Sequence, residues 1–181
     1  MTESEHSAVR VGKWTMEDIH TVLETEPGSL FAILDACDEP RVPQKVDELE
    51  DRAVSLYRGS AERDCWAIAP YLAQVDEGLL DWIVENLWDD PWGILAQTTT
   101  DLAKLRTHFR RFLMVEDPDG DKMYFRFYDP RVLSTFLTNC TESEAEEFFG
   151  PIRRFCVADK EKTLTILERE GATTSAPVRN A

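Results

Sequence analysis

Apolar and polar residues follow two periods along the chain, one typical of strands and one typical of helices. A continuous apolar run covers residues 30–36, with Asp35 near its end, and predicts a strand buried on both faces of a largely parallel sheet. Shorter runs predict further strands at 53–57, 66–69, 92–97 and 155–158. Between them, apolar residues recur in steps of three and four, which predicts helices beginning after Thr15, at Pro43, at Glu77, after Thr100, at Pro130 and after Thr141.

Local signals mark the ends of several predicted elements. Capping-box spacing occurs twice, at Thr15 with Asp18 and at Thr141 with Glu144. Asp129 and Pro130 suit the N-cap and the first position of a helix, because proline is tolerated there and a carboxylate can accept the free backbone N–H groups. The turn at 117–120 joins two strand-like runs and predicts an antiparallel hairpin whose second arm covers residues 122–128.

Strands that alternate with helices predict an α/β fold: a mixed, mostly parallel sheet flanked by helices, with a late antiparallel hairpin. A length of 181 residues fits one ordinary domain. We expect residues 1–13 to be a flexible N-terminal segment and 14–160 to form a single α/β domain. Residues 161–181 are expected to be a C-terminal extension, frayed after 171 because small and polar residues dominate there.

Composition narrows the classes of function. Hydrophobic residues make up 43% of the chain and charged residues 30%, which is a globular balance. Asp and Glu number 35 against 20 Lys and Arg, so the formal net charge is −15. Such a surface repels phosphate, which argues against nucleic acid and against anionic membranes as partners.

The predicted compartment is the cytoplasm. The first eleven residues lack the apolar core of a signal peptide, and no apolar run approaches the roughly 20 residues that span a bilayer. The four cysteines are widely scattered along the chain, which favours reduced thiols over a disulfide framework.

Five short motifs occur in one order across most of the chain. They are Phe31-Ala32-Ile33-Leu34-Asp35-Ala36, Ala69-Pro70-Tyr71-Leu72, Trp92-Gly93, Arg126-Phe127-Tyr128-Asp129-Pro130-Arg131-Val132-Leu133 and Phe148-Phe149-Gly150-Pro151. In this order they resemble the family called domain of unknown function 4123. The fourth motif is the longest and the most specific. After Gly150 the chain is shorter than many members, which carry a longer C-terminal lobe.

The resemblance implies a cytoplasmic adaptor or chaperone of the bacterial type VI secretion system. Such a protein binds a toxin effector and the valine-glycine repeat spike protein, without being secreted itself. The family has no catalytic signature, so the resemblance implies no enzyme, no cofactor, no metal site and no catalytic residues. Two alternatives stay open: an immunity protein that binds a toxin, and a small Asp-dependent hydrolase.

Candidate partner-binding residues lie in two places. Arg126, Tyr128 and Arg131 belong to the longest motif, and strand alternation would place Arg126 and Tyr128 on the same face. Trp88 and Trp92 bracket a short acidic loop, and tryptophan is enriched among the residues that dominate binding at interfaces. For both groups a purely structural role, as helix cap or core residue, is the alternative interpretation.

Two further clusters rich in charged residues could serve either a function or the fold alone. Asp35, Cys37 and Asp38 follow a predicted central strand, where α/β folds place ligands. Asp35 and Asp38 would serve the hydrolase, with or without a divalent cation. The three histidines, His6, His20 and His108, show no metal-ligand spacing. A basic cluster, made up of Lys104, Arg106, Arg110 and Arg111, either complements a helix dipole or binds an acidic partner.

Overall fold

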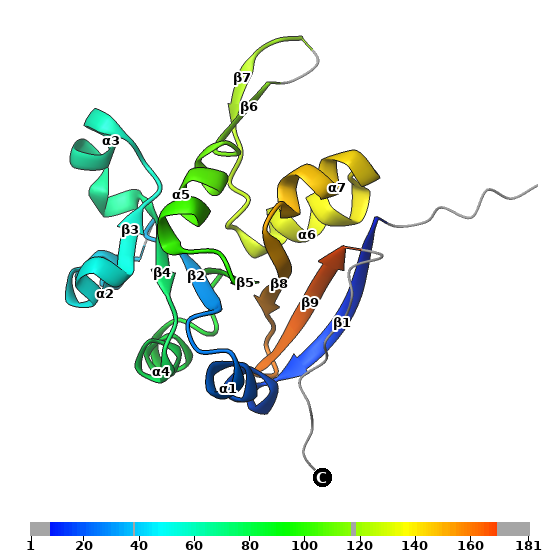
Figure 1. Ribbon diagram of the computed structural model, residues 1–181. Coiled ribbons are helices and arrows are strands. Elements are labelled where there is room, and N and C mark those ends of the chain that lie inside the picture. Colours follow the sequence, from blue (N-terminus) through cyan, green and yellow to red (C-terminus); the bar gives the residue numbers. More distant parts are fainter. Residues whose placement is uncertain (1–7, 38, 117–118, 170–181) are drawn as a thin grey trace, which may run out of the picture.

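The computed structural model describes residues 8–37, 39–116 and 119–169. Seven strands form one sheet in the order β1-β9-β8-β5-β2-β4-β3. Their bounds are β1 Val9–Thr15, β2 Leu30–Asp35, β3 Ala53–Ser55, β4 Pro70–Gln74, β5 Gly93–Thr98, β8 Ile152–Ala158 and β9 Thr163–Arg169. Two more strands, β6 Met114–Glu116 and β7 Lys122–Tyr124, form a separate hairpin that projects from the body of the molecule (Figure 1).

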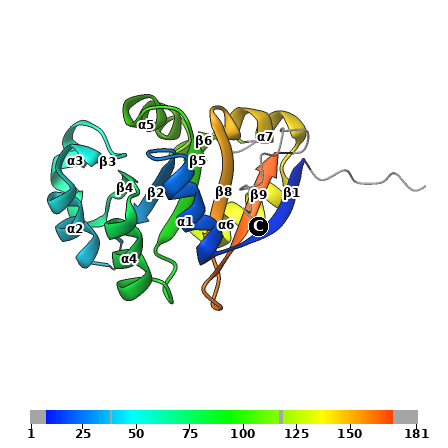
Figure 2. The same ribbon diagram turned by 60° about the horizontal axis from the view of Figure 1, so that its bottom comes forward.

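Helices cover both faces of the sheet (Figures 1 and 2). One layer holds α1 Met16–Thr25, α2 Arg41–Leu49 and α4 Glu77–Asn86, and the other holds α5 Leu102–Arg110, α6 Pro130–Asn139 and α7 Glu142–Phe149. The short helix α3 Gly59–Asp64 and the 3-10 turns η1 Glu50–Arg52 and η2 Trp66–Ile68 lie beside β3 and β4 in the chain. In the described part of the chain, no helix is long and apolar enough to cross a membrane.

The expected mostly parallel sheet is wrong, because all six strand pairings of the large sheet are antiparallel. We based that expectation on β2, whose six residues are all buried. In β2, Leu30 and Leu34 pack with one helical layer, while Phe31 and Ile33 pack with the other. A continuous apolar run therefore indicates that both faces of the strand are covered, but it does not indicate strand direction. Helices on both sides can cover an antiparallel sheet as well as a parallel one.

Local signals are confirmed where they depend on neighbouring residues. Both capping boxes form, and Asp129 caps α6 through the backbone N–H of Arg131. The predicted strand at 66–69 is instead the turn η2, followed by β4. The hairpin at 114–124 is confirmed as antiparallel, although its second strand ends at Tyr124 and not at Tyr128.

The outermost strands on one side of the sheet, β1 and its neighbour β9, were not predicted. Only Val9 and Trp14 are buried in β1, so its sequence shows little apolar alternation. The two strands pair along their whole length, from Val9 with Arg169 to Thr15 with Thr163. The sheet therefore extends into both segments that we expected to flank the domain at 14–160. The expected frayed tail after 171 lies outside the described residues.

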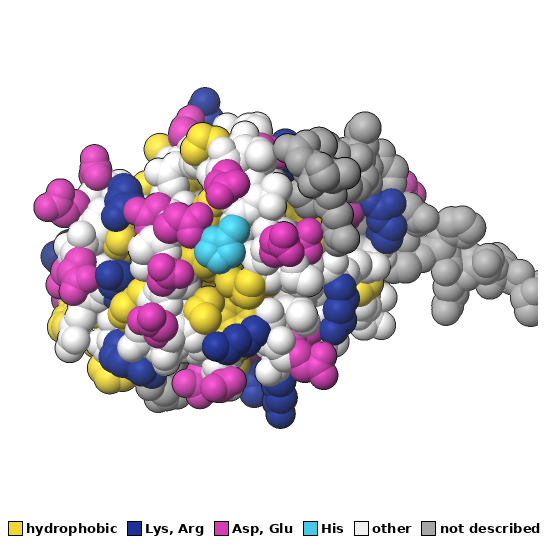
Figure 3. Space-filling view, turned by 90° about the horizontal axis from the view of Figure 1, so that it is seen from below, with side chains coloured by type: hydrophobic (Ala, Val, Ile, Leu, Met, Phe, Trp, Pro, Cys, Tyr) yellow, Lys and Arg dark blue, Asp and Glu magenta, His cyan; other side chains and the backbone are white. Residues whose placement is uncertain are grey.

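Acidic side chains spread over the face of the molecule seen from below in Figure 1, with Lys and Arg side chains among them and apolar side chains gathered near the middle (Figure 3). Figure 1 places α1 and α4 on this side. This distribution agrees with the net charge of −15.

Candidate functional site

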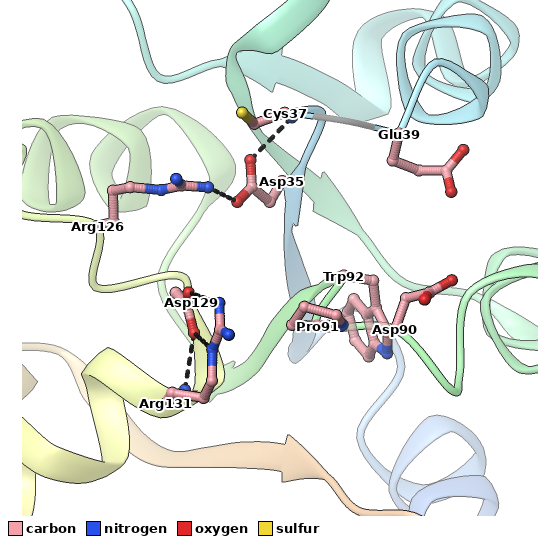
Figure 4. A pocket seen from close by; sticks show the side chains of 9 residues that line it. All are labelled: Asp35, Cys37, Glu39, Asp90, Pro91, Trp92, Arg126, Asp129 and Arg131. Atoms are coloured by element: carbon pink, nitrogen blue, oxygen red, sulfur yellow. Dashed lines mark hydrogen bonds and ion pairs between the residues drawn. The ribbon is translucent and has the colours of Figure 1, made fainter.

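A polar pocket lies where β2 ends. Asp35 is the last residue of β2, and its backbone N–H donates to the Trp92 carbonyl, 2.8 Å away, just before β5 begins. The segment that leads into α6 passes beside this point and brings Arg126 and Asp129 to it (Figure 4). We call this the Asp35 pocket; it has a volume of about 270 Å³ and is lined by Asp35, Cys37, Glu39, Asp90, Pro91, Trp92, Arg126, Asp129 and Arg131.

One wall of the pocket is an ion pair between Arg126 and Asp35. Nη2 of Arg126 donates to Oδ2 of Asp35 at 2.5 Å, and Oδ1 accepts the backbone N–H of Cys37 at 3.0 Å. The hydrogen bond to Asp35 raises the pKa of Arg126 above its ordinary value, so the guanidinium stays charged. The Asp35 side chain is 7% exposed, whereas that of Arg126 is 43% exposed. The pair thus fixes a positive group at the mouth of the pocket.

A second arginine is fixed in a similar way. The Asp129 carboxylate accepts the backbone N–H of Arg131 at 2.9 Å, and it also accepts Nε at 3.0 Å and Nη2 at 2.6 Å. The hydrogen bond from Arg131 lowers the pKa of Asp129, which therefore stays ionised near neutral pH. With 76% of its side chain exposed, Arg131 can contact a partner while Asp129 holds its orientation.

Gly93, next to the lining residue Trp92, is required for steric reasons. Gly93 has φ +145°, and a Cβ atom there would lie 2.0 Å from the carbonyl oxygen of Ile33 on β2. Only glycine allows this approach of β5 to β2. Trp92 is 3% exposed, and its buried Nε1 has no hydrogen-bond partner among the described residues.

The other two predicted partner-binding residues lie in the core. Tyr128 is 2% exposed, and its hydroxyl lies 3.4 Å from that of Tyr124. Because β7 ends at Tyr124, strand alternation no longer applies, and both Phe127 and Tyr128 are buried. Trp88 is 5% exposed and donates Nε1 to the Asp159 carbonyl at 2.7 Å, outside the Asp35 pocket. The pocket therefore collects Arg126, Arg131 and Trp92, but neither Tyr128 nor Trp88.

The residues considered for a hydrolase are only partly assembled. Asp35 and Cys37 line the pocket, but both carboxylate oxygens of Asp35 are already hydrogen-bonded. Asp38 lies outside the described residues. Within the described ranges, no group of three or more His, Cys, Asp or Glu could hold a metal ion.

Two pocket carboxylates were not singled out from the sequence. Glu39 accepts Nε of Arg41 at 2.7 Å, and the hydrogen bond from Arg41 lowers the pKa of Glu39. Asp90 reaches the pocket from the loop between α4 and β5. Neither residue belongs to a motif, and both depend on how two loops meet, so no local signal could have identified them.

The basic cluster on α5 serves mainly the fold. Arg106 donates Nε to the Ser55 carbonyl at 2.9 Å, and Arg110 donates Nε to the Leu56 carbonyl at 2.9 Å. These bonds satisfy carbonyls at the end of β3. The remaining two residues make exposed ion pairs, Lys104 with Asp101 and Arg111 with Glu147.

Comparison with known proteins places the chain in a family. The family model described as Domain of unknown function (DUF4123) matches residues 30–147, which extend from the start of β2 almost to the end of α7. Searches of curated proteins and of solved structures returned no match. Since the match covers more than half of the 181 residues, this chain belongs to the DUF4123 family.

Proposed function

We propose that the chain is a cytoplasmic adaptor of the type VI secretion system, which binds a toxin effector and loads it onto the valine-glycine repeat spike protein. The proposal starts from family membership and from the adaptor role that the resemblance implies. It requires stoichiometric binding and no reaction. An exterior with net charge −15 would steer basic partner surfaces and oppose self-association.

The observation that carries the proposal is the meeting of three motif segments at the Asp35 pocket. Residues 31–36, 92–93 and 126–133 are far apart in sequence, yet each contributes to the lining. Arg126 and Arg131 both keep an exposed guanidinium there that a carboxylate holds in place. A preorganised arginine loses little entropy on binding, so it suits recognition of carboxylates and carbonyls on a partner.

Carboxylates in the same pocket give it both signs of charge. Glu39 and Asp90 lie opposite the two arginines (Figure 4). A polar segment of a partner that carries both acidic and basic groups would find complementary groups in one place. This arrangement favours a protein partner over a purely anionic small molecule.

The test is co-purification from the native host with a tagged chain, followed by mass spectrometry. Wild-type protein should recover a spike protein and one toxin-like polypeptide. Arg131→Glu should lose at least one of them. Arg131 is 76% exposed but its partner Asp129 only 10%, so the free energy of unfolding of this variant is measured beside its binding. The control is Arg111→Glu, which makes the same charge reversal at an exposed arginine that pairs with Glu147 and does not line the pocket, and it should bind normally.

Three results would contradict the proposal. Recovery of a toxin alone, with protection of its target, would indicate an immunity protein instead. Equal binding by wild type and Arg131→Glu would remove the Asp35 pocket from the interface. Recovery of no stable partner would refute the adaptor role, and the Asp35 carboxylate would then be tested for hydrolysis through Asp35→Asn.

A further inference from the structure

A second surface, apart from the Asp35 pocket, lies between η2 and the β6–β7 hairpin. This groove has a volume of about 390 Å³, and its sides include Ile68 from η2 and Met114 and Tyr124 from the hairpin. We call it the hairpin groove. None of its lining residues lines the Asp35 pocket, so the two surfaces can be altered independently.

Exposed apolar side chains gather at this groove. Six large hydrophobic residues are exposed in the described part of the chain, and three of them line the groove: Ile68 at 49%, Met114 at 50% and Tyr124 at 41%. A fourth, Trp66 at 54%, does not line it but belongs to the same turn, η2, as Ile68. Scattered single apolar residues are normal on a surface, but a contiguous group beside a hollow marks an interaction site. A partner that covered these side chains would remove apolar area from water.

The hairpin itself indicates that something packs against it. Among the residues that the structure describes, β6 and β7 pair only with each other. Five of their six residues are exposed, and the sixth, Val115, is half-buried. An isolated two-stranded hairpin is at best marginally stable in water. Contact with a partner along the groove would stabilise it.

The charges at the groove indicate the chemistry of that partner. Arg58 and Arg110 are the only charged residues in its lining. Arg110 donates Nε and Nη2 to the carbonyls of Ser55, Leu56 and Tyr57, and its Nη2 lies 3.7 Å from Oε2 of Glu62, so it already has partners within the chain. Arg58 is exposed and makes no ion pair with any residue that the structure describes. In a chain of net charge −15, an apolar groove whose rim carries an unpaired cation is complementary to an acidic group beside an apolar one.

We infer that the hairpin groove binds a segment of a partner protein that presents a bulky apolar side chain next to a carboxylate. The apolar side chain lies between Ile68 and Met114, and the carboxylate pairs with Arg58. This inference rests on the proposed function, since it gives one partner of the adaptor a defined recognition chemistry.

The hairpin offers a matched pair of variants. Met114 and Met123 lie on adjacent strands and are 50% and 49% exposed. Met114 pairs with Tyr124 and lines the groove, whereas Met123 pairs with Val115 and therefore points to the opposite face of the hairpin. Met114→Glu thus changes the groove, and Met123→Glu places the same charge on the same hairpin outside it.

The probe is a displayed library of random peptides, panned against the full chain, with the affinity of selected peptides measured by fluorescence polarisation. We expect enrichment of sequences with a bulky apolar residue next to Asp or Glu. Met114→Glu and Arg58→Glu should each weaken binding by about tenfold or more, and Met123→Glu by less than about twofold. Replacing the acidic residue of the peptide by Lys should restore binding to Arg58→Glu.

Other outcomes overturn the inference. They are the absence of any enriched peptide, enrichment of basic peptides, or equal losses in Met114→Glu and Met123→Glu. Sedimentation measurements test whether a second copy of this chain fills the groove instead. A wild-type dimer that Met114→Glu converts to a monomer would show that it does. Panning needs neither toxin nor spike, so failure here is separate from failure of the adaptor role, which co-purification reports.

Discussion

Replacement of Gly93 by alanine should strongly destabilise the protein. Gly93 opens β5 and pairs with Leu34 of β2, in the middle of the seven-stranded sheet. Its φ of +145° is unfavourable for any residue with a side chain, and the new Cβ would lie 2.0 Å from the Ile33 oxygen and 3.2 Å from Cα of Leu34. Both neighbours are backbone atoms, so no side-chain rotation can relieve the clash.

Two contributions set the magnitude. Holding alanine in this backbone conformation costs about 1–3 kcal/mol. Relief of the clash requires β5 and β2 to separate by more than an ångström, which leaves at least one buried backbone hydrogen bond unmade at about 1–3 kcal/mol. The sum, about 2–6 kcal/mol, is a large part of the roughly 5–15 kcal/mol that stabilises a typical domain.

Urea unfolding of purified Gly93→Ala and wild type would measure the difference. Gly78→Ala is the control, because Gly78 is exposed on α4 and its added Cβ would meet only an Asp76 oxygen at an ordinary 3.6 Å. That variant should be neutral or slightly more stable, since alanine favours the helix. If Gly93→Ala unfolded within about 0.5 kcal/mol of wild type, the steric account of the Trp92-Gly93 motif would be wrong.

Three further predictions concern side chains whose hydrogen bonds and ion pairs involve the strands β1, β8 and β9 or the turn between β8 and β9. Arg154→Ala should lower the free energy of unfolding by about 2 kcal/mol in denaturant titrations, because the buried carboxylate of Glu168 loses one of its two cations: Arg154 Nε lies 2.7 Å from it, and Arg10 Nη2, at 2.6 Å, remains. Trp88→Phe should cost about 1 kcal/mol in the same assay through loss of the bond to the Asp159 carbonyl. The hydrogen bond from Lys13 lowers the pKa of Asp159 below its ordinary 3.8, so ionised Asp159 stabilises the fold above that pH. The loss of stability caused by Asp159→Asn should therefore shrink as the pH falls below about 4. A stability difference that does not change with pH would contradict this prediction.

Elements encoded by neighbouring residues were predictable, and their arrangement was not. The N-cap of α1 depends on Thr15 and Asp18, three residues apart, and it was read correctly from sequence. Strand direction depends on residues far apart, such as Asp35 of β2 and Pro70 of β4, and the apolar run alone could not decide it. β1 was missed because only its inner side chains Val9 and Trp14 are buried.

In the candidate site, too, local features were predictable from the sequence and contacts between distant residues were not. The position of Asp35 after a buried strand was a correct signal for a pocket, but its partner Arg126 lies 91 residues further along the chain. The motif that contains Arg126 indicated the right segment without indicating which side chains face outward. Burial of Tyr128 follows from the end of β7 at Tyr124, which depends on the hairpin and not on the motif.

The motif residues near the pocket differ in what the fold needs from them, and this decides which one can test binding. Phe127 is fully buried and stacks on Phe109 with ring centroids 5.2 Å apart, so its replacement would test packing. Removing Arg126 would leave Asp35 as a buried carboxylate without its cation, which mixes a folding defect with any loss of binding. Arg131 also pairs with a mostly buried carboxylate, that of Asp129, but its own side chain is 76% exposed, and the backbone N–H that it gives to Asp129 is retained by every substitution except proline. A binding defect in Arg131→Glu at unchanged stability would therefore report on the surface alone.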